Sequence, residues 1–167
     1  QCGFRQDRST TDHHINLTTE IQYAFNNKQH LTAIFFDLEK AFDTTWRHNI
    51  IQTLQEKNIK GNITFFIQNL LQQRKFKLKS HGRFSDEKQL ENGIPQGSPL
   101  STTLFLIAID KITTHIAFPS KALLFADDLV IFCRGKDIHA IERQLQTTVN
   151  NIEKWANSTG FTFSVPK

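Results

Sequence analysis

Methionine is absent from this sequence of 167 residues, which begins at Gln1. We therefore expect a piece of a longer polypeptide. No apolar run approaches the roughly 20 residues that span a bilayer, so a membrane-spanning segment is not expected within it. No secretory signal is recognisable, and a fragment could have lost one. The two cysteines, Cys2 and Cys133, lack metal-ligand spacing, and we interpret them as free thiols in a reducing compartment.

The composition that remains is that of a folded domain. Hydrophobic residues make up 38% of the chain and charged residues 22%, which suits one domain with its own core. The formal net charge of +4 is compatible with a polyanionic partner but does not establish one.

Hydrophobic periodicity predicts interspersed helices and strands. Ser9 and Asp12 resemble an N-terminal capping box, and Gly160 is expected to end the last helix. The apolar run 31–36 is typical of a central buried strand. Asp43 is interpreted as the cap of the second helix, with a metal ligand as the alternative. Helices are expected around residues 14–25, 43–54, 63–71, 100–112 and 138–155, with Ile63, Phe66, Ile67, Leu70 and Leu71 as the buried stripe of the third. Together these patterns favour an α+β fold with a mixed, largely antiparallel sheet and helices packed on one face.

Two adjacent aspartates, Asp127 and Asp128, lie between the apolar runs 123–126 and 129–132. Such runs are typical of buried strands, so the pair marks the turn of a hairpin. Burying an unpaired carboxylate is costly in free energy. The pair therefore either forms a plain turn that is open to water or holds a cation, and this stretch alone leaves both interpretations open.

A third carboxylate, Asp37, directly follows the buried strand 31–36. If this strand neighbours the hairpin in one sheet, three carboxylates meet at one edge and repel one another unless cations are present. Carboxylate oxygens suit Mg²⁺, which combines a few carboxylates with substrate phosphates. Two such ions about 4 Å apart form a clamp for in-line phosphoryl transfer.

A basic stretch without any acidic residue occupies positions 74–83. It carries Arg74, Lys75, Lys77, Lys79 and Arg83. Its period-two pattern predicts a half-exposed strand with a partner near residues 89–90. Two interpretations stay open, namely a solvated edge strand protected by lysines and a surface that contacts a phosphate backbone.

Five segments in chain order, at residues 1–10, 35–47, 93–101, 125–128 and 155–163, resemble those of reverse transcriptases. The core motifs are FFDLEKAFD at 35–43, GIPQGSPLS at 93–101 and FADD at 125–128. Residues 1–10 resemble the segment that precedes the first catalytic aspartate in non-LTR (LINE-type) retrotransposons. Residues 43–47 and 155–163 resemble the I-element and jockey-like groups in particular. Each motif alone is moderately specific, but all five in this order make the chain similar to that family over its whole length.

The resemblance implies a metal site. Asp37 and Asp127 would bind two catalytic Mg²⁺ ions, for which Mn²⁺ can substitute. The backbone carbonyl of Leu38 would help to hold them, and Asp128 would complete the catalytic acidic set.

The resemblance also implies contacts with substrates. Phe42 corresponds to the aromatic steric gate that excludes a 2′-hydroxyl, although a core aromatic would fit the same pattern. Gln96 and Gly97 would line the pocket for nucleotide and template. Lys167 would contact the triphosphate or protonate the leaving pyrophosphate. Contacts with nucleic acid are implied for Arg5 and Arg8, for which a structural salt bridge is the alternative.

The fold implied is a polymerase palm (split βαβ, ferredoxin-like) with part of the fingers over residues 1–167, and with the N-terminal fingers and the thumb outside it. The implied activity is RNA-directed DNA polymerisation, in which dNTPs are added to a DNA primer on an RNA template. The isolated fragment is expected to be inactive. The family also implies a larger polyprotein with an endonuclease, acting in the cytoplasm and nucleus without a membrane. The alternative is an inactive or domesticated remnant that only binds nucleic acid.

Overall fold

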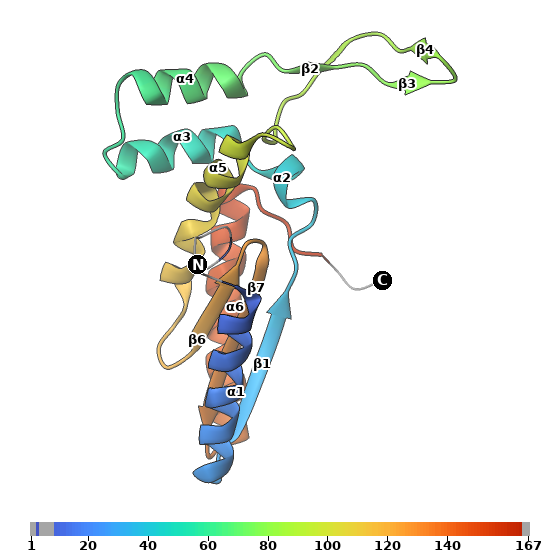
Figure 1. Cartoon of the computed structure of the whole chain (residues 1–167). Coiled ribbons are helices and arrows are strands. Elements are labelled where there is room, and N and C mark those ends of the chain that lie inside the picture. Colours follow the sequence, from blue (N-terminus) through green and yellow to red (C-terminus); the bar gives the residue numbers. More distant parts are fainter. Residues whose placement is uncertain (1–2, 4–8, 165–167) are drawn as a thin grey trace. The chain divides into compact units, whose positions relative to one another are not determined.

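The computed structural model describes residue 3 and residues 9–164, and the chain divides into two compact units (Figure 1). The sheet unit consists of Gln1–Ala41 and Ile109–Lys167, and the insert unit consists of Phe42–Ala108. Among the described residues, no helix has the length and apolar content needed to cross a membrane.

An antiparallel sheet of three strands, in the order β1–β7–β6, forms the centre of the sheet unit. β1 spans His30–Phe36, β6 spans Lys121–Phe125 and β7 spans Asp128–Gly135. β7 is the central strand and is apolar on both sides, since Leu129, Ile131 and Phe132 are all buried. The predicted hairpin is present, and the predicted strand at 31–36 lies beside it as β1. The expectation of a central buried strand is wrong, because β1 lies at the edge of this sheet and its residues are half-buried or exposed, with Phe35 69% exposed.

Two helices cover opposite faces of this sheet (Figure 1). α1 (Thr10–Asn26) lies on the face of Lys121 and Arg134, because both of these side chains pair with Glu20 of α1. α6 (Ile138–Thr159) packs on the other face of β1 and β7. The α+β fold class with an antiparallel sheet is confirmed. The expectation that the helices pack on one face only is wrong, because α1 covers the face opposite α6. A central strand that is apolar on both sides must be covered on both sides.

Local signals set the ends of these helices as expected. The main-chain N–H of Ser9 donates to Asp12 Oδ2 at 2.9 Å, completing the capping box of α1. α6 ends at Gly160, whose φ of 80° is left-handed. The 3₁₀ helix η1 (Asp110–His115) replaces the last part of the helix expected at 100–112. Cys133 is a buried free thiol, and Cys2 lies outside the described residues.

The insert unit begins with two helices where one was expected. α2 covers Ala41–Thr44 and α3 covers Arg47–Glu56, with Trp46 in extended conformation as the N-cap of α3. The interpretation of Asp43 as a helix cap is therefore wrong, because Asp43 lies inside α2. α5 (Pro99–Ile109) follows the GIPQGSPLS motif and ends at the boundary between the units.

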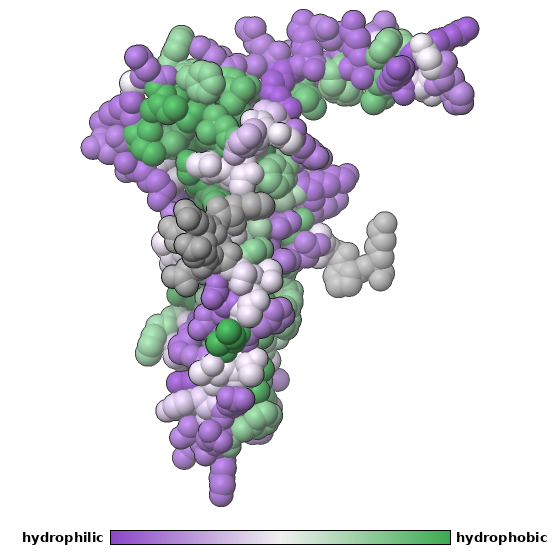
Figure 2. Space-filling model, viewed as in Figure 1, coloured by the Kyte–Doolittle hydropathy of each residue, from purple (hydrophilic) through white to green (hydrophobic). Residues whose placement is uncertain are grey.

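The apolar stripe of α4 (Asn62–Leu71) is only partly buried. Ile67 and Leu71 are buried, but Ile63 and Phe66 are 49% and 55% exposed, as is the neighbouring Phe65 at 66%. Figure 2 shows the resulting apolar area over α4. The prediction of a fully buried stripe is wrong, because α3 covers one side of α4 and the stripe is wider than that contact.

The basic stretch forms a protruding hairpin, which we call the basic arm (Arg74–Leu90). Its inner rung pairs β2 (Lys75–Phe76) with β5 (Lys88–Gln89), and its outer rung pairs β3 (Lys79–Ser80) with β4 (Arg83–Phe84). Lys75 lies opposite Gln89, which confirms the expected partner strand.

Candidate active site

The turn between β6 and β7 consists of Ala126 and Asp127, and it is closed by the pair Phe125↔Asp128. Ala126 has a φ of 53°, a left-handed value that residues other than glycine rarely adopt. Ala126 is buried, and Gly3 fits closely against it, since a Cβ on Gly3 would lie 2.8 Å from Ala126 Cα. This packing holds a strained turn in place, as is common at functional sites.

The register of the sheet brings the third aspartate to the same place. The pairing of β1 with β7 ends at Phe36↔Leu129, so Asp37 and Asp128 are the next residues of the two strands at that end of the sheet. Asp37 and Asp128 are exposed and Asp127 is half-exposed. The predicted convergence of three carboxylates at one edge is thus found in the backbone.

The C-terminal segment of the chain pairs with the other side of Asp37–Glu39. Leu38 faces Phe163 in an antiparallel bridge, flanked by bonds from the N–H of Glu39 to the carbonyl of Thr162 and from the N–H of Ser164 to the carbonyl of Asp37. In such a pair the carbonyl of the middle residue points away from the partner segment. The carbonyl of Leu38 therefore points to the side of β7, where the aspartates lie.

Electrostatics couples the three carboxylates. The pKa of Asp128 is raised above its ordinary value, first by burial and then by the negative charges of Asp127 and Asp37. Carboxylate and carbonyl oxygens are hard donors that suit a divalent cation, and a cation would relieve this repulsion. Within the described residues, the side chains do not yet gather into a group of three metal ligands. The chemistry of this donor set fits a divalent ion.

The residues expected at a nucleotide belong to the insert unit. Phe42 is half-buried and stacks on Phe105, with ring centroids 5.1 Å apart. Gln96 is exposed, and its Nε2 donates to Oδ1 of Asp43 at 2.9 Å. Gly97 has a φ of 84° and open space around it. The bond between Asp43 and Gln96 was not expected, because no local pattern joins residues 53 positions apart.

The loop that carries Gln96 is tied to α2 and α3 by its backbone. The N–H of Gly93 donates to the carbonyl of Thr45 at 3.0 Å, and the N–H of Ile94 donates to the carbonyl of Phe42 at 2.9 Å. Arg47 donates to the carbonyls of Leu90, Asn92 and Gly93, at 2.7, 3.0 and 3.3 Å. Sequence reasoning missed Arg47, whose only signal is its place inside a motif resembling the jockey-like group.

The basic residues of the arm have different surroundings. Arg74 donates to the carbonyl of Gly93 at 3.2 Å. Burial, and then the charge of Arg74, lowers the pKa of Arg47. Lys75 pairs with Glu87 at 2.6 Å, and Lys79 lies over the ring of Phe84. The implied sites Arg5, Arg8 and Lys167 lie outside the described residues.

The chain matches one protein family model and several curated proteins. The family model described as reverse transcriptase (RNA-dependent DNA polymerase) matches residues 1–167. The chain is 29% identical over 161 residues to the probable RNA-directed DNA polymerase from transposon BS of Drosophila melanogaster, covering 93% of this chain and 18% of that protein. It is 24% identical over 164 residues to the RNA-directed DNA polymerase from mobile element jockey of the same species, covering 95% and 18%. The chain thus spans less than a fifth of the length of these relatives.

Solved structures show the same fold at low identity. The apo telomerase from Candida tropicalis, truncated from its C-terminal domain, matches with a TM-score of 0.65 and 15% identity, covering 95% of this chain and 36% of that chain. The telomerase from Candida albicans in complex with a fragment of telomeric RNA matches with a TM-score of 0.54 and 13% identity, covering 93% and 30%. Both share the polymerase palm fold with this chain. The motifs, the convergence of three aspartates and the full-length family match agree, and this chain belongs to the reverse transcriptase family, as its resemblance to non-LTR retrotransposon enzymes predicted.

Proposed function

We propose that this chain forms the palm, with an adjoining part of the fingers, of an RNA-directed DNA polymerase. The sheet unit is the palm in this assignment, and the insert unit supplies the part of the fingers. One observation supports it above all: Asp37, Asp127 and Asp128 come to the same end of an antiparallel sheet in a chain of the reverse transcriptase family. The proposed reaction is attack of a primer 3′-hydroxyl on the α-phosphate of a dNTP, directed by an RNA template.

The acidic end of the sheet is the proposed place of two Mg²⁺ ions, with Mn²⁺ as a substitute. Asp37 and Asp127 would hold them together with the carbonyl of Leu38, and Asp128 would complete the set. Bound there, the ions would lower the pKa of the primer hydroxyl and neutralise the charge of the leaving pyrophosphate. The chain itself fixes the backbone of this site. The buried turn residue Ala126 and the pairing of β1 with β7 keep the carboxylates at the solvent-exposed end of the sheet.

The incoming nucleotide is proposed to contact Phe42, Gln96 and Gly97. Phe105 supports one face of the Phe42 ring, and a ring held in this way rejects the added volume of a 2′-hydroxyl. The open space around Gly97 lets a ligand approach the backbone closely. Lys167 is proposed to contact the triphosphate on the family pattern alone.

Template and primer are proposed to contact the basic arm. Lys77 and Lys79 are exposed there beside the exposed apolar side chains Leu78 and Phe84. Basic and apolar side chains in alternation suit a phosphate backbone with unstacked bases. Lys75 and Arg74 would add charge to this surface, although each also has a structural partner in the insert unit. Arg5 and Arg8 are proposed contacts on the family pattern. We further propose that the parent polyprotein carries an endonuclease and acts within the cell, in the cytoplasm and nucleus.

The test is primer extension by a polypeptide that carries this chain with its natural flanking sequence. We expect extension of oligo(dT) on poly(rA) with dTTP that requires Mg²⁺ and prefers dTTP to UTP. Asp127→Asn is expected to abolish it, while Glu153→Gln, at an exposed acidic residue of α6 away from the proposed sites, should leave it unchanged. Extension by the Asp127→Asn variant at the wild-type rate would refute the metal assignment. Nucleic-acid binding without any extension would favour the inactive remnant.

A further inference from the structure

The hydrogen bond between Asp43 and Gln96 joins two parts of the insert unit that lie far apart in the sequence. Asp43 is in α2, next to Phe42, and Gln96 is in the loop that precedes α5. Gln96 Nε2 lies 2.9 Å from Asp43 Oδ1. The bond thus connects two segments that are both proposed to contact a nucleotide, one through Phe42 and the other through Gln96 and Gly97.

The chemistry of the two groups sets the orientation of the glutamine. An ionised carboxylate can only accept hydrogen bonds, so the amide nitrogen of Gln96 must face Asp43. The carbonyl oxygen Oε1 of Gln96 then points away from Asp43. An exposed glutamine without such a partner rotates freely about its last torsion and offers either atom. Asp43 therefore determines which atom Gln96 presents to a ligand.

The course of the loop does not depend on this bond. Main-chain bonds from Gly93 and Ile94 already hold the loop against α2, and Arg47 adds three bonds to its carbonyls. Asp43 and Gln96 are themselves exposed. Removing the Asp43 carboxylate should therefore free the Gln96 side chain and leave the backbone of the loop unchanged.

We propose that Asp43 is a positioning residue that orients the Gln96 carboxamide for contact with the incoming nucleotide. This inference rests on the proposed polymerase function. Asp43 acts through Gln96 and needs no contact of its own with the substrate. Its role depends on an acceptor oxygen and not on negative charge, so asparagine can replace it, because Oδ1 of asparagine also accepts a bond from an amide.

Steady-state incorporation of dTTP on poly(rA)/oligo(dT), by the polypeptide with its natural flanks, tests the proposal. Asp43→Ala is expected to raise KM for dTTP by about 3- to 10-fold, the usual range for losing one hydrogen bond, with a smaller effect on kcat. Asp43→Asn should stay near the wild-type KM. Glu91→Ala, which removes another exposed carboxylate of the insert unit, is the matched control and should leave KM unchanged.

A double-mutant cycle separates positioning from a general structural role. In a Gln96→Ala background, Asp43→Ala should have no further effect on KM. An equal effect of Asp43→Ala in both backgrounds, or an Asp43→Asn variant as impaired as Asp43→Ala, overturns the proposal. If the wild type extends the primer and Asp43→Ala matches it, this inference alone fails. If the wild type does not extend the primer under any divalent ion, the proposed function fails and the inference fails with it.

Discussion

Gly93 shows how a single residue sets the geometry of the loop that carries Gln96. Its φ is 81°, and a Cβ built there would lie 2.8 Å from the carbonyl oxygen of Asp43. That neighbour is backbone and is held by further main-chain bonds, so it cannot move away cheaply. Glycine is required here both by the torsion angle and by the close approach of α2.

We therefore expect Gly93→Ala to lower the free energy of unfolding by about 2–4 kcal/mol. Gly82→Ala at the tip of the basic arm is the control, because Gly82 also has a positive φ, of 76°, but nothing within 4 Å of a Cβ. It should cost about 1 kcal/mol, from the torsion alone. Urea unfolding followed by circular dichroism measures both. Equal losses in the two variants would contradict the importance of the close approach.

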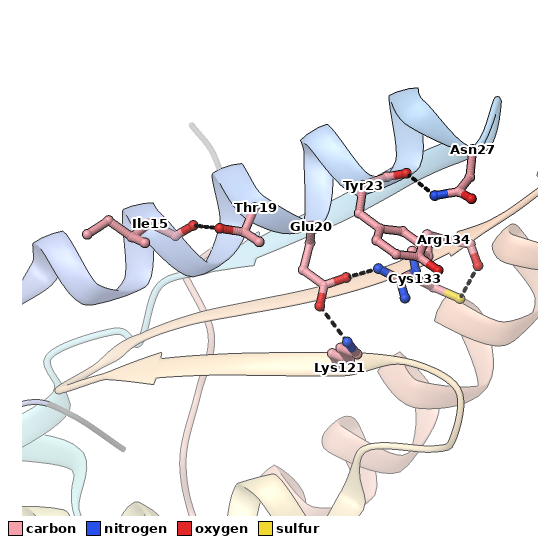
Figure 3. Close-up of polar contacts among 8 residues, drawn as sticks. All are labelled: Ile15, Thr19, Glu20, Tyr23, Asn27, Lys121, Cys133 and Arg134. Atoms are coloured by element: carbon pink, nitrogen blue, oxygen red, sulfur yellow. Dashed lines mark hydrogen bonds and ion pairs between the residues drawn. The ribbon is translucent and has the colours of Figure 1, made fainter.

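At the scale of elements, α1 is attached to the sheet by one carboxylate with two basic partners. Glu20 pairs with Lys121 of β6 and with Arg134 of β7 (Figure 3). The guanidinium of Arg134 also lies 3.9 Å from the centroid of the Tyr23 ring on α1. Glu20 is mostly buried, at 20% side-chain exposure, so these two partners contact a carboxylate that has little access to water.

Glu20→Gln is expected to lower the stability of the sheet unit by about 1–2 kcal/mol, because it leaves Arg134 without its carboxylate in a partly buried site. The measurement is urea unfolding of a Trp46→Phe background, in which Trp155 of α6 is the remaining tryptophan and reports on the sheet unit. Glu153→Gln, on the exposed side of α6, is the control and should change little. A Glu20→Gln variant as stable as this control would show that α1 is held by apolar packing alone.

At the scale of the whole molecule, the cluster of acidic residues and the cluster of basic residues lie in different units. The sheet unit places three carboxylates at one end of its sheet, and the insert unit carries the basic arm. The acidic end has a cost, because burial and then the negative charges of Asp127 and Asp37 disfavour the ionised form of Asp128 and raise its pKa. Proteins commonly accept such local repulsion where a site needs it.

This cost predicts an effect of metal removal on stability. In EDTA, Asp128→Asn should raise the free energy of unfolding by about 0.5 kcal/mol, a small value because solvent screens these charges. Millimolar Mg²⁺ should stabilise the wild type and should stabilise Asp128→Asn less, because binding to the folded state shifts the equilibrium. Trp155 fluorescence in the Trp46→Phe background measures both. Equal stabilisation by Mg²⁺ in wild type and variant would argue against ion binding at this end of the sheet.

The sequence by itself determined the features that depend on neighbours a few residues apart. The capping box of Ser9 and Asp12, the glycine that ends α6, the hairpin around Asp127 and the strand that ends at Asp37 were all predictable, because each is encoded in a short window. The order of the reverse transcriptase motifs was visible in the same way, and with it the family.

Only the tertiary structure decided the contacts between distant residues. No periodicity indicates that Glu20 pairs with Arg134, that Asp43 holds Gln96 or that Arg74 supports the carbonyl of Gly93. The tertiary structure also decided that Ile63 and Phe66 of α4 are exposed and that both faces of the sheet are covered by helices. A helix pattern shows which side is apolar, but what covers that side depends on which elements pack against it in three dimensions.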